Sequence, residues 1–196
     1  MDNFIDLFDL LVNIGTLIVA WLALSTWKKQ LKGTDEYQLL KKLLIATYEV
    51  EEKIKFVRNP MVTMKKEDIE TSSKLDVEMN IYNERYNALI KEYLILKPLV
   101  LEANFYWDKN DVKALFTPLE GIIGELNGAI WHHFWSKGAY DPYNKPMIDA
   151  AQKIANDKII YDTSSKTAPD EFTKKVSLTI AEIETFINEN MKKKFR

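Results

Sequence analysis

The residues of this sequence best suited to proton transfer or metal binding are two adjacent histidines, His132 and His133, in the motif IWHHFW. Adjacent residues on a helix point about 100° apart, so this pair does not form the one-face metal site that residues four apart form. The sequence has no cysteine, no HExxH zinc motif, no phosphate-binding glycine loop and no GxSxG motif. We therefore expect no metal, no cofactor and no enzyme, and we interpret both histidines as structural residues near Trp131 and Trp135.

A second set of polar and small residues lies near the N-terminus and recurs at alternating spacings of four and three, which places it on one helical face. The set comprises Asp2, Asp6, Asp9, Asn13, Thr16, Ala20 and Ala23. In one interpretation, Asp6 and Asp9 lie among lipid headgroups while the later residues form a packing seam between helices. In the other, several copies of the chain form a ring in which Asp6, Asp9, Asn13 and Thr16 line a water-filled opening.

The same segment has the pattern of a membrane span. Residues 10–27 contain no charge, and these 18 residues form about 27 Å of helix, the lower end of what crosses a bilayer. The acidic start disfavours a cleaved signal peptide, which leaves a buried core helix as the other alternative. By the positive-inside rule, the N-terminus lies outside and the rest of the chain is cytoplasmic. The residues predicted to anchor this helix at the membrane interface are Trp21, Trp27, Lys28, Lys29 and Lys32.

We divide the chain into a transmembrane helix with its flanks, residues 1–32, and a helical-bundle domain, residues 33–196. In the second part, apolar residues recur at helical spacing, and short connections favour antiparallel neighbours. We expect Pro98 to kink a helix rather than end it, because the apolar spacing continues beyond it. The predicted helices run from an N-cap at Thr34 to near Pro60, over 75–100, over 112–130 after a cap at Asp108 or Asn110, around 148–154, and from a capping box at Thr167 and Asp170 to 191. The predicted fold class is all-α.

The composition limits the partners of this chain. Its 196 residues include 27 Lys and Arg against 29 Asp and Glu, a net charge of -2. Proteins that bind nucleic acid directly usually have a marked basic excess, so we expect no direct DNA binding. The expected partners are a lipid bilayer and further copies of the same chain.

One segment of the predicted helix over 112–130, extended to His132, resembles the motif of HEPN ribonucleases. It reads Leu126-Asn127-Gly128-Ala129-Ile130-Trp131-His132. In that family an arginine, often followed by a polar residue such as asparagine, precedes by several residues a histidine that acts on RNA. Asn127 and His132 match the polar residue and the histidine, whereas Leu126 stands in place of the arginine and offers no charge to a phosphate.

With its N-terminal span, helical domain and altered motif, the chain resembles the small HEPN-like membrane accessory proteins of type VI-B CRISPR systems. This resemblance implies a divergent HEPN-like bundle anchored in a bacterial inner membrane. It also implies a membrane-embedded ring that forms a pore, strengthens RNA-guided antiviral defence and is functionally linked to an RNA-guided nuclease.

Three functional hypotheses follow from these patterns. The first is a homo-oligomeric pore-forming or membrane-permeabilising effector. The second is a membrane-tethered helical scaffold that recruits a partner without forming a pore. The third is a HEPN-type ribonuclease that uses His132.

Overall fold

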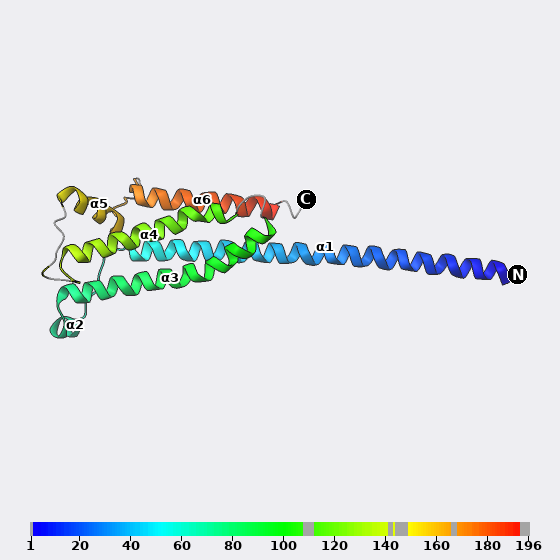
Figure 1. Ribbon diagram of the computed structural model, residues 1–196, viewed down its shortest axis with the longest axis horizontal. Coiled ribbons are helices and arrows are strands. Elements are labelled where there is room, and N and C mark those ends of the chain that lie inside the picture. The colour runs from blue at the N-terminus through cyan, green and yellow to red at the C-terminus, as the bar shows by residue number, and fades with distance from the viewer. Residues whose placement is uncertain (1, 108–111, 141–142, 144–148, 166–167, 193–196) are drawn as a thin grey trace.

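The computed structural model shows an all-helical chain with one helix much longer than the others (Figure 1). The helices are α1 (Asp2–Val57), α2 (Lys66–Thr71), α3 (Lys74–Tyr106), α4 (Val112–Ser136), α5 (Ala150–Ile160) and α6 (Glu171–Lys192). The structure describes all residues except 1, 108–111, 141–142, 144–148, 166–167 and 193–196, and the side chains of 2–12, 68, 69 and 71 also lie outside its description. No strand occurs in the described part of the chain, which confirms the predicted all-α class.

Helix α1 is continuous across the predicted boundary between the two parts of the chain. Its 56 residues extend over about 84 Å, and its N-terminal half projects from the bundle (Figure 1). The predicted N-cap at Thr34 is therefore wrong. The Thr34 hydroxyl instead donates a hydrogen bond to the Gln30 carbonyl one turn earlier, at 3.0 Å, a bond that threonine forms inside helices.

The second half of α1 forms an antiparallel bundle with α3, α4 and α6, and α5 packs on α4 (Figure 1). The predicted apolar faces supply its core. The largest side chains that are fully buried are Leu40, Leu43, Ile54, Tyr82, Leu89, Leu96, Leu119, Ile122, Leu126, Phe134, Ile160 and Ile183. In α6, for example, the buried apolar residues Phe172, Val176, Ile180, Ile183 and Ile187 recur every three or four positions, because that spacing places side chains on one face of a helix.

The ends of the helices follow ordinary capping rules. The Ser73 hydroxyl accepts the Asp76 amide at the start of α3, and Asp149 and Asp170 accept amides in the first turns of α5 and α6. The proposed caps at Asp108, Asn110 and Thr167 lie outside the described residues. Helix α3 continues past Pro98 to Tyr106 and bends in its last part, as predicted (Figure 1).

The C-terminus of α4 turns through Gly138, whose φ of 85° lies in the left-handed region that glycine adopts without strain. The Gly138 and Ala139 amides donate back to the carbonyls of Trp135 and Phe134, which satisfies the last turn of the helix.

Among residues whose side chains the structure describes, no helix contains a stretch long and apolar enough to cross a membrane.

Candidate functional site

The part of α1 outside the bundle exposes apolar side chains in every direction. Leu17 is 70% exposed and Val19 is 66% exposed. Because successive helical residues turn by 100°, Leu17, Ile18 and Val19 point to three different sides. A helix that packs on a soluble core has one apolar stripe, whereas a helix that is apolar all round is typical of lipid or protein surroundings. The other exposed apolar residues of this segment are Ile14, Trp21, Leu22, Leu24 and Trp27.

Three of the predicted pore-lining or packing residues, Asn13, Thr16 and Ala20, are exposed in this segment. Since α1 is one unbroken helix here, their spacing of three and four places them on one face. The side chains of Asp6 and Asp9 lie outside the described residues. The bundle therefore uses none of the three described members of this face.

Of the predicted interface anchors, the two tryptophans lie within the apolar segment and the three lysines lie between it and the bundle. All of them are exposed: Trp21, Trp27, Lys28, Lys29 and Lys32. The Lys32 ammonium lies 3.8 Å from the Glu36 carboxylate one turn later, where α1 enters the bundle. The basic flank is thus placed at the exit of α1 from the bundle, in the order that the sequence predicts.

The HEPN-like residues do not form one site on α4. Leu126, at the position of the family's arginine, is fully buried, while Asn127 is exposed and His132 is half-buried. Asn127 and His132 are five residues apart, so they point about 140° apart on a helix. The His132 ring packs against Trp131 and Trp135, with centroids 5.1 and 5.9 Å away, as expected for a structural histidine.

His133, in contrast, lies in a buried polar cluster that the sequence patterns did not indicate. Its Nδ1 is 3.3 Å from a carboxylate oxygen of Asp157 on α5, and its Nε2 is 3.9 Å from Glu78 on α3. The same Nε2 is 3.3 Å from the Tyr161 hydroxyl, which follows α5. Lys137, one turn after His133, pairs with Glu78 at 3.2 Å. The cluster therefore joins α3, α4 and α5 at the end of the bundle remote from the free part of α1.

Burial decides the protonation of this cluster. Desolvation lowers the pKa of His133 from 6.5, and the neighbouring Lys137 lowers it further, against the opposing effect of Asp157 and Glu78. Burial also raises the pKa of Tyr82 to about 12 and raises the pKa of Tyr161. The imidazole and both phenols are thus neutral at pH 7. Within the described residues, three buried polar side-chain atoms form no hydrogen bond: the Tyr82 hydroxyl, the His132 Nδ1 and the Asp157 oxygen that faces His133 as an ion-pair partner at 3.3 Å.

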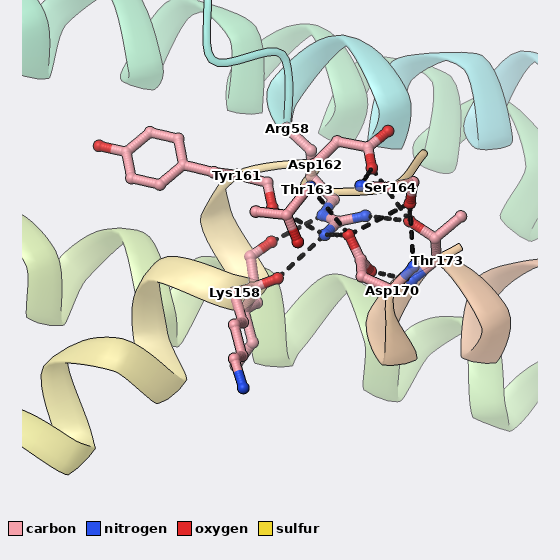
Figure 2. A network of polar contacts seen from close by, with 9 residues as sticks. Arg58, Lys158, Tyr161, Asp162, Thr163, Ser164, Asp170 and Thr173 are labelled. Atoms are coloured by element: carbon pink, nitrogen blue, oxygen red, sulfur yellow. Dashed lines mark hydrogen bonds and ion pairs between the residues drawn. The ribbon is translucent and has the colours of Figure 1, made fainter. Parts of the chain in front are cut away.

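A second polar network surrounds Arg58, which immediately follows α1 and is only 3% exposed (Figure 2). Its guanidinium donates to the Asp170 carboxylate at 2.9 Å and to the Thr173 hydroxyl at 2.6 Å. It also donates to three backbone carbonyls at the end of α5, those of Lys158, Ile159 and Tyr161, at 2.7 to 3.1 Å. The planar fork of an arginine suits such a set of acceptors.

Asp170 serves both this network and the start of α6. Burial alone raises the pKa of its carboxyl group, but hydrogen bonds from the Thr173 amide and from Arg58, together with the arginine charge, outweigh burial and hold the pKa well below 3.8. The carboxylate is therefore charged wherever the fold is stable. The sequence predicted Asp170 as part of a helix start, but not its partner 112 residues earlier.

The described residues offer little for small-molecule chemistry. They contain no group of three or more His, Cys, Asp or Glu side chains that could hold a metal ion. A surface pocket of about 460 Å³ lies beside the Arg58 network, but Lys158, Lys175, Asp170 and Glu171 give it mixed charge. We interpret the two networks as polar contacts that hold neighbouring helices together.

Comparisons of this chain with models of protein families, with curated proteins and with solved structures find no match.

We predict that Arg58→Ala lowers the free energy of unfolding by about 3 kcal/mol, because it leaves the Asp170 carboxylate, only 11% exposed, without its charged partner. Urea denaturation of the full chain in detergent, followed by circular dichroism, measures this change. The matched control is Lys55→Ala three residues earlier in α1, which removes only ion pairs to Glu51 and Glu52 and should cost less than about 1 kcal/mol. Equal effects of the two substitutions would contradict a fastening role for Arg58.

We also predict that the stability of the protein falls as the pH drops below the ordinary histidine pKa of 6.5. Below that value the unfolded chain binds a proton at residue 133, whereas the folded chain, with its lowered pKa, does not. In His133→Gln the fall between pH 6.5 and the onset of carboxyl titration should be shallower. The control His132→Gln keeps His133 and should keep the slope, and an unchanged slope in His133→Gln would refute the assignment.

Proposed function

We propose that the protein is a single-pass membrane-anchored helical bundle, in which the projecting part of α1 lies in a lipid bilayer and holds the bundle on the cytoplasmic side. The observation that carries this proposal is the exposed apolar surface around the whole circumference of α1 between Ile14 and Trp27. In water, exposure of this apolar surface would cost free energy, since the bundle covers none of it. In a bilayer, lipid chains would cover it.

The length of the segment supports the same proposal. Its described part begins at Asn13, so residues 13–27 give about 22 Å of helix, and the preceding Leu10, Leu11 and Val12 of the charge-free sequence extend it to about 27 Å. The hydrocarbon core of a bilayer is about 30 Å thick, and short spans are accommodated by local thinning and by snorkelling of flanking residues. Lys28 and Lys29 follow directly and are exposed, as snorkelling requires.

The anchor can be tested by placing a charge in the middle of the proposed span. Leu17→Arg combined with Val19→Arg should move most of the protein from the membrane fraction to the soluble or aggregated fraction, since each arginine costs about 2.5 to 3.5 kcal/mol at the centre of a span. Flotation of cell membranes on a density gradient measures the distribution.

The control for this experiment is Leu178→Arg on α6, where the side chain is 66% exposed on the bundle. It adds a charge to an equally accessible leucine and should leave the protein with the membranes. If the double arginine variant floats as the unchanged protein does, α1 is not the anchor.

A second candidate function, a homo-oligomeric membrane pore, is favoured by the polar and small face formed by Asn13, Thr16 and Ala20. These residues lie within the proposed span, and polar side chains within a span normally face protein or water rather than lipid. Copies that pack along this face would place Asn13 against protein rather than lipid, and a ring of them would permeabilise the membrane. This agrees with the resemblance to CRISPR-associated membrane accessory proteins and with a role in antiviral defence.

We expect the protein in mild detergent to be oligomeric, and Asn13→Leu to shift it toward monomer while the neighbouring Ile14→Leu does not. Mass photometry or native mass spectrometry measures the distribution, and dye release from vesicles reports pore formation. A protein that is monomeric and causes no release would leave the tethered scaffold as the function. If the protein forms oligomers that release no dye and that Asn13→Leu does not disrupt, then Asn13 and Thr16 neither line a pore nor form a packing seam.

A further inference from the structure

Aromatic side chains gather at the end of the bundle from which α1 projects. Phe105, Tyr106 and Trp107 are consecutive residues at the C-terminus of α3, and Phe105 is 84% exposed. Their rings contact one another edge to face or tilted, with centroids 6.0 and 5.7 Å apart, and Trp107 contacts Phe186 of α6 at 6.4 Å. The group thus extends from Trp107 and Phe186, which pack against the core, to the exposed ring of Phe105 at the bundle surface. Figure 1 shows that α3 and α6 both end on this side of the bundle.

Residues of α1 that neighbour Tyr106 show where this aromatic group lies along α1. Tyr106 lines a surface pocket together with Asp35, Gln38 and Lys42 of α1. From Trp27, the last residue of the apolar segment, to Asp35 the helix rises about 12 Å. The headgroup layer on each side of a bilayer is about 5 to 8 Å thick, and spans tilt by about 20° on average. Neighbouring helix axes lie about 8 to 10 Å apart, so a tilt of this size toward α3 brings the end of α3 about 3 Å closer to the bilayer. The end of α3 then lies at about 8 Å, the outer edge of the headgroup layer.

The charges between the apolar segment and the bundle agree with a nearby membrane surface. Lys28 and Lys29 are exposed there, whereas the first acidic groups are Asp35 and Glu36, of which Glu36 is paired with Lys32. Glu102 and Lys42 line the same pocket as Tyr106. Along α1, cations thus come first after the apolar segment and complement anionic headgroups, and the acids follow at the level of Tyr106.

From these observations we propose that Phe105 and Tyr106 form a second membrane contact, inserted among the lipid headgroups of the bilayer that holds α1. This inference rests on the proposed anchor and deepens it. Amphipathic and apolar rings are favoured at the interface between lipid chains and water, and one exposed phenylalanine beside a tyrosine presents such a surface. Two contacts, the span and the aromatic group, fix how the bundle is oriented above the membrane.

The absence of cysteine makes this proposal directly testable, because a single introduced cysteine can be labelled without background. Three single-cysteine variants of the full chain are labelled with an environment-sensitive fluorophore and reconstituted in vesicles of phosphatidylcholine and phosphatidylglycerol. Phe105→Cys tests the proposal. Leu17→Cys reports the anchor, and Met61→Cys, 77% exposed beyond the far end of α1, is the matched control on the bundle. Quenching is measured with lipids that carry a nitroxide either at the headgroup or deep in the acyl chain.

We expect the label at residue 105 to be quenched by headgroup nitroxide about twofold more than the label at residue 61, and the label at residue 17 by acyl-chain nitroxide. Equal quenching at 105 and 61, with residue 17 quenched in the acyl region, would overturn the second contact and leave the anchor intact. No quenching at residue 17 would overturn the anchor and with it this inference. Quenching at 105 by acyl-chain rather than headgroup nitroxide would overturn the interfacial position.

To separate a membrane contact from a contact between copies, the same labels are compared at high dilution of protein in lipid. A membrane contact keeps its quenching, since each copy has its own lipid. Loss of headgroup quenching at residue 105 on dilution would show that a second copy, not lipid, brings that residue to the surface, and would overturn the proposal.

Discussion

The buried guanidinium of Arg58 joins three separate parts of the bundle. Arg58 leaves the end of α1 and binds the last carbonyls of α5 and the first turn of α6, segments about a hundred residues away in the chain. A buried charge is tolerated only where every donor finds an acceptor, so the loop between α5 and α6 must take the one path that supplies them. Arg85 acts in a similar way on the other side of α1, where it donates to the carbonyls of Asn59 and Met61. The two arginines hold the segment after α1 from both sides.

The apolar pattern of the sequence was enough to predict the helices and most of the core. Spacings of three and four along α3 and α6 correctly indicated buried residues such as Leu89, Leu96 and Ile183, because helical periodicity is a local property. The prediction failed at Thr34, where threonine followed by two acids has the pattern of a helix start. Threonine and acidic residues are also compatible with the middle of a helix. Here apolar residues precede and follow them, and α1 continues through them without a break.

The sequence could not indicate the polar networks, since their members are brought together only by packing. His133 finds Glu78 on α3 and Asp157 on α5, and Arg58 finds Asp170 on α6. Only two weak signals of these networks were present in the sequence. One is an arginine at the end of an apolar face, and the other is a histidine on the side of α4 that carries Ile130 and Phe134. The apolar segment of α1 is the opposite case, because its composition alone defines it and the bundle leaves it uncovered.

Because α1 is unbroken, it also fixes the distance between the residues at its two ends. From Trp27 to Val57 it rises by about 45 Å, and from Glu36 onward the bundle packs along it without a hinge. The end that carries α2 and α5 therefore stands at a set height above the plane in which Trp27 lies. A single proline or glycine pair placed between Gln30 and Thr34 would abolish that fixed height while leaving the core untouched.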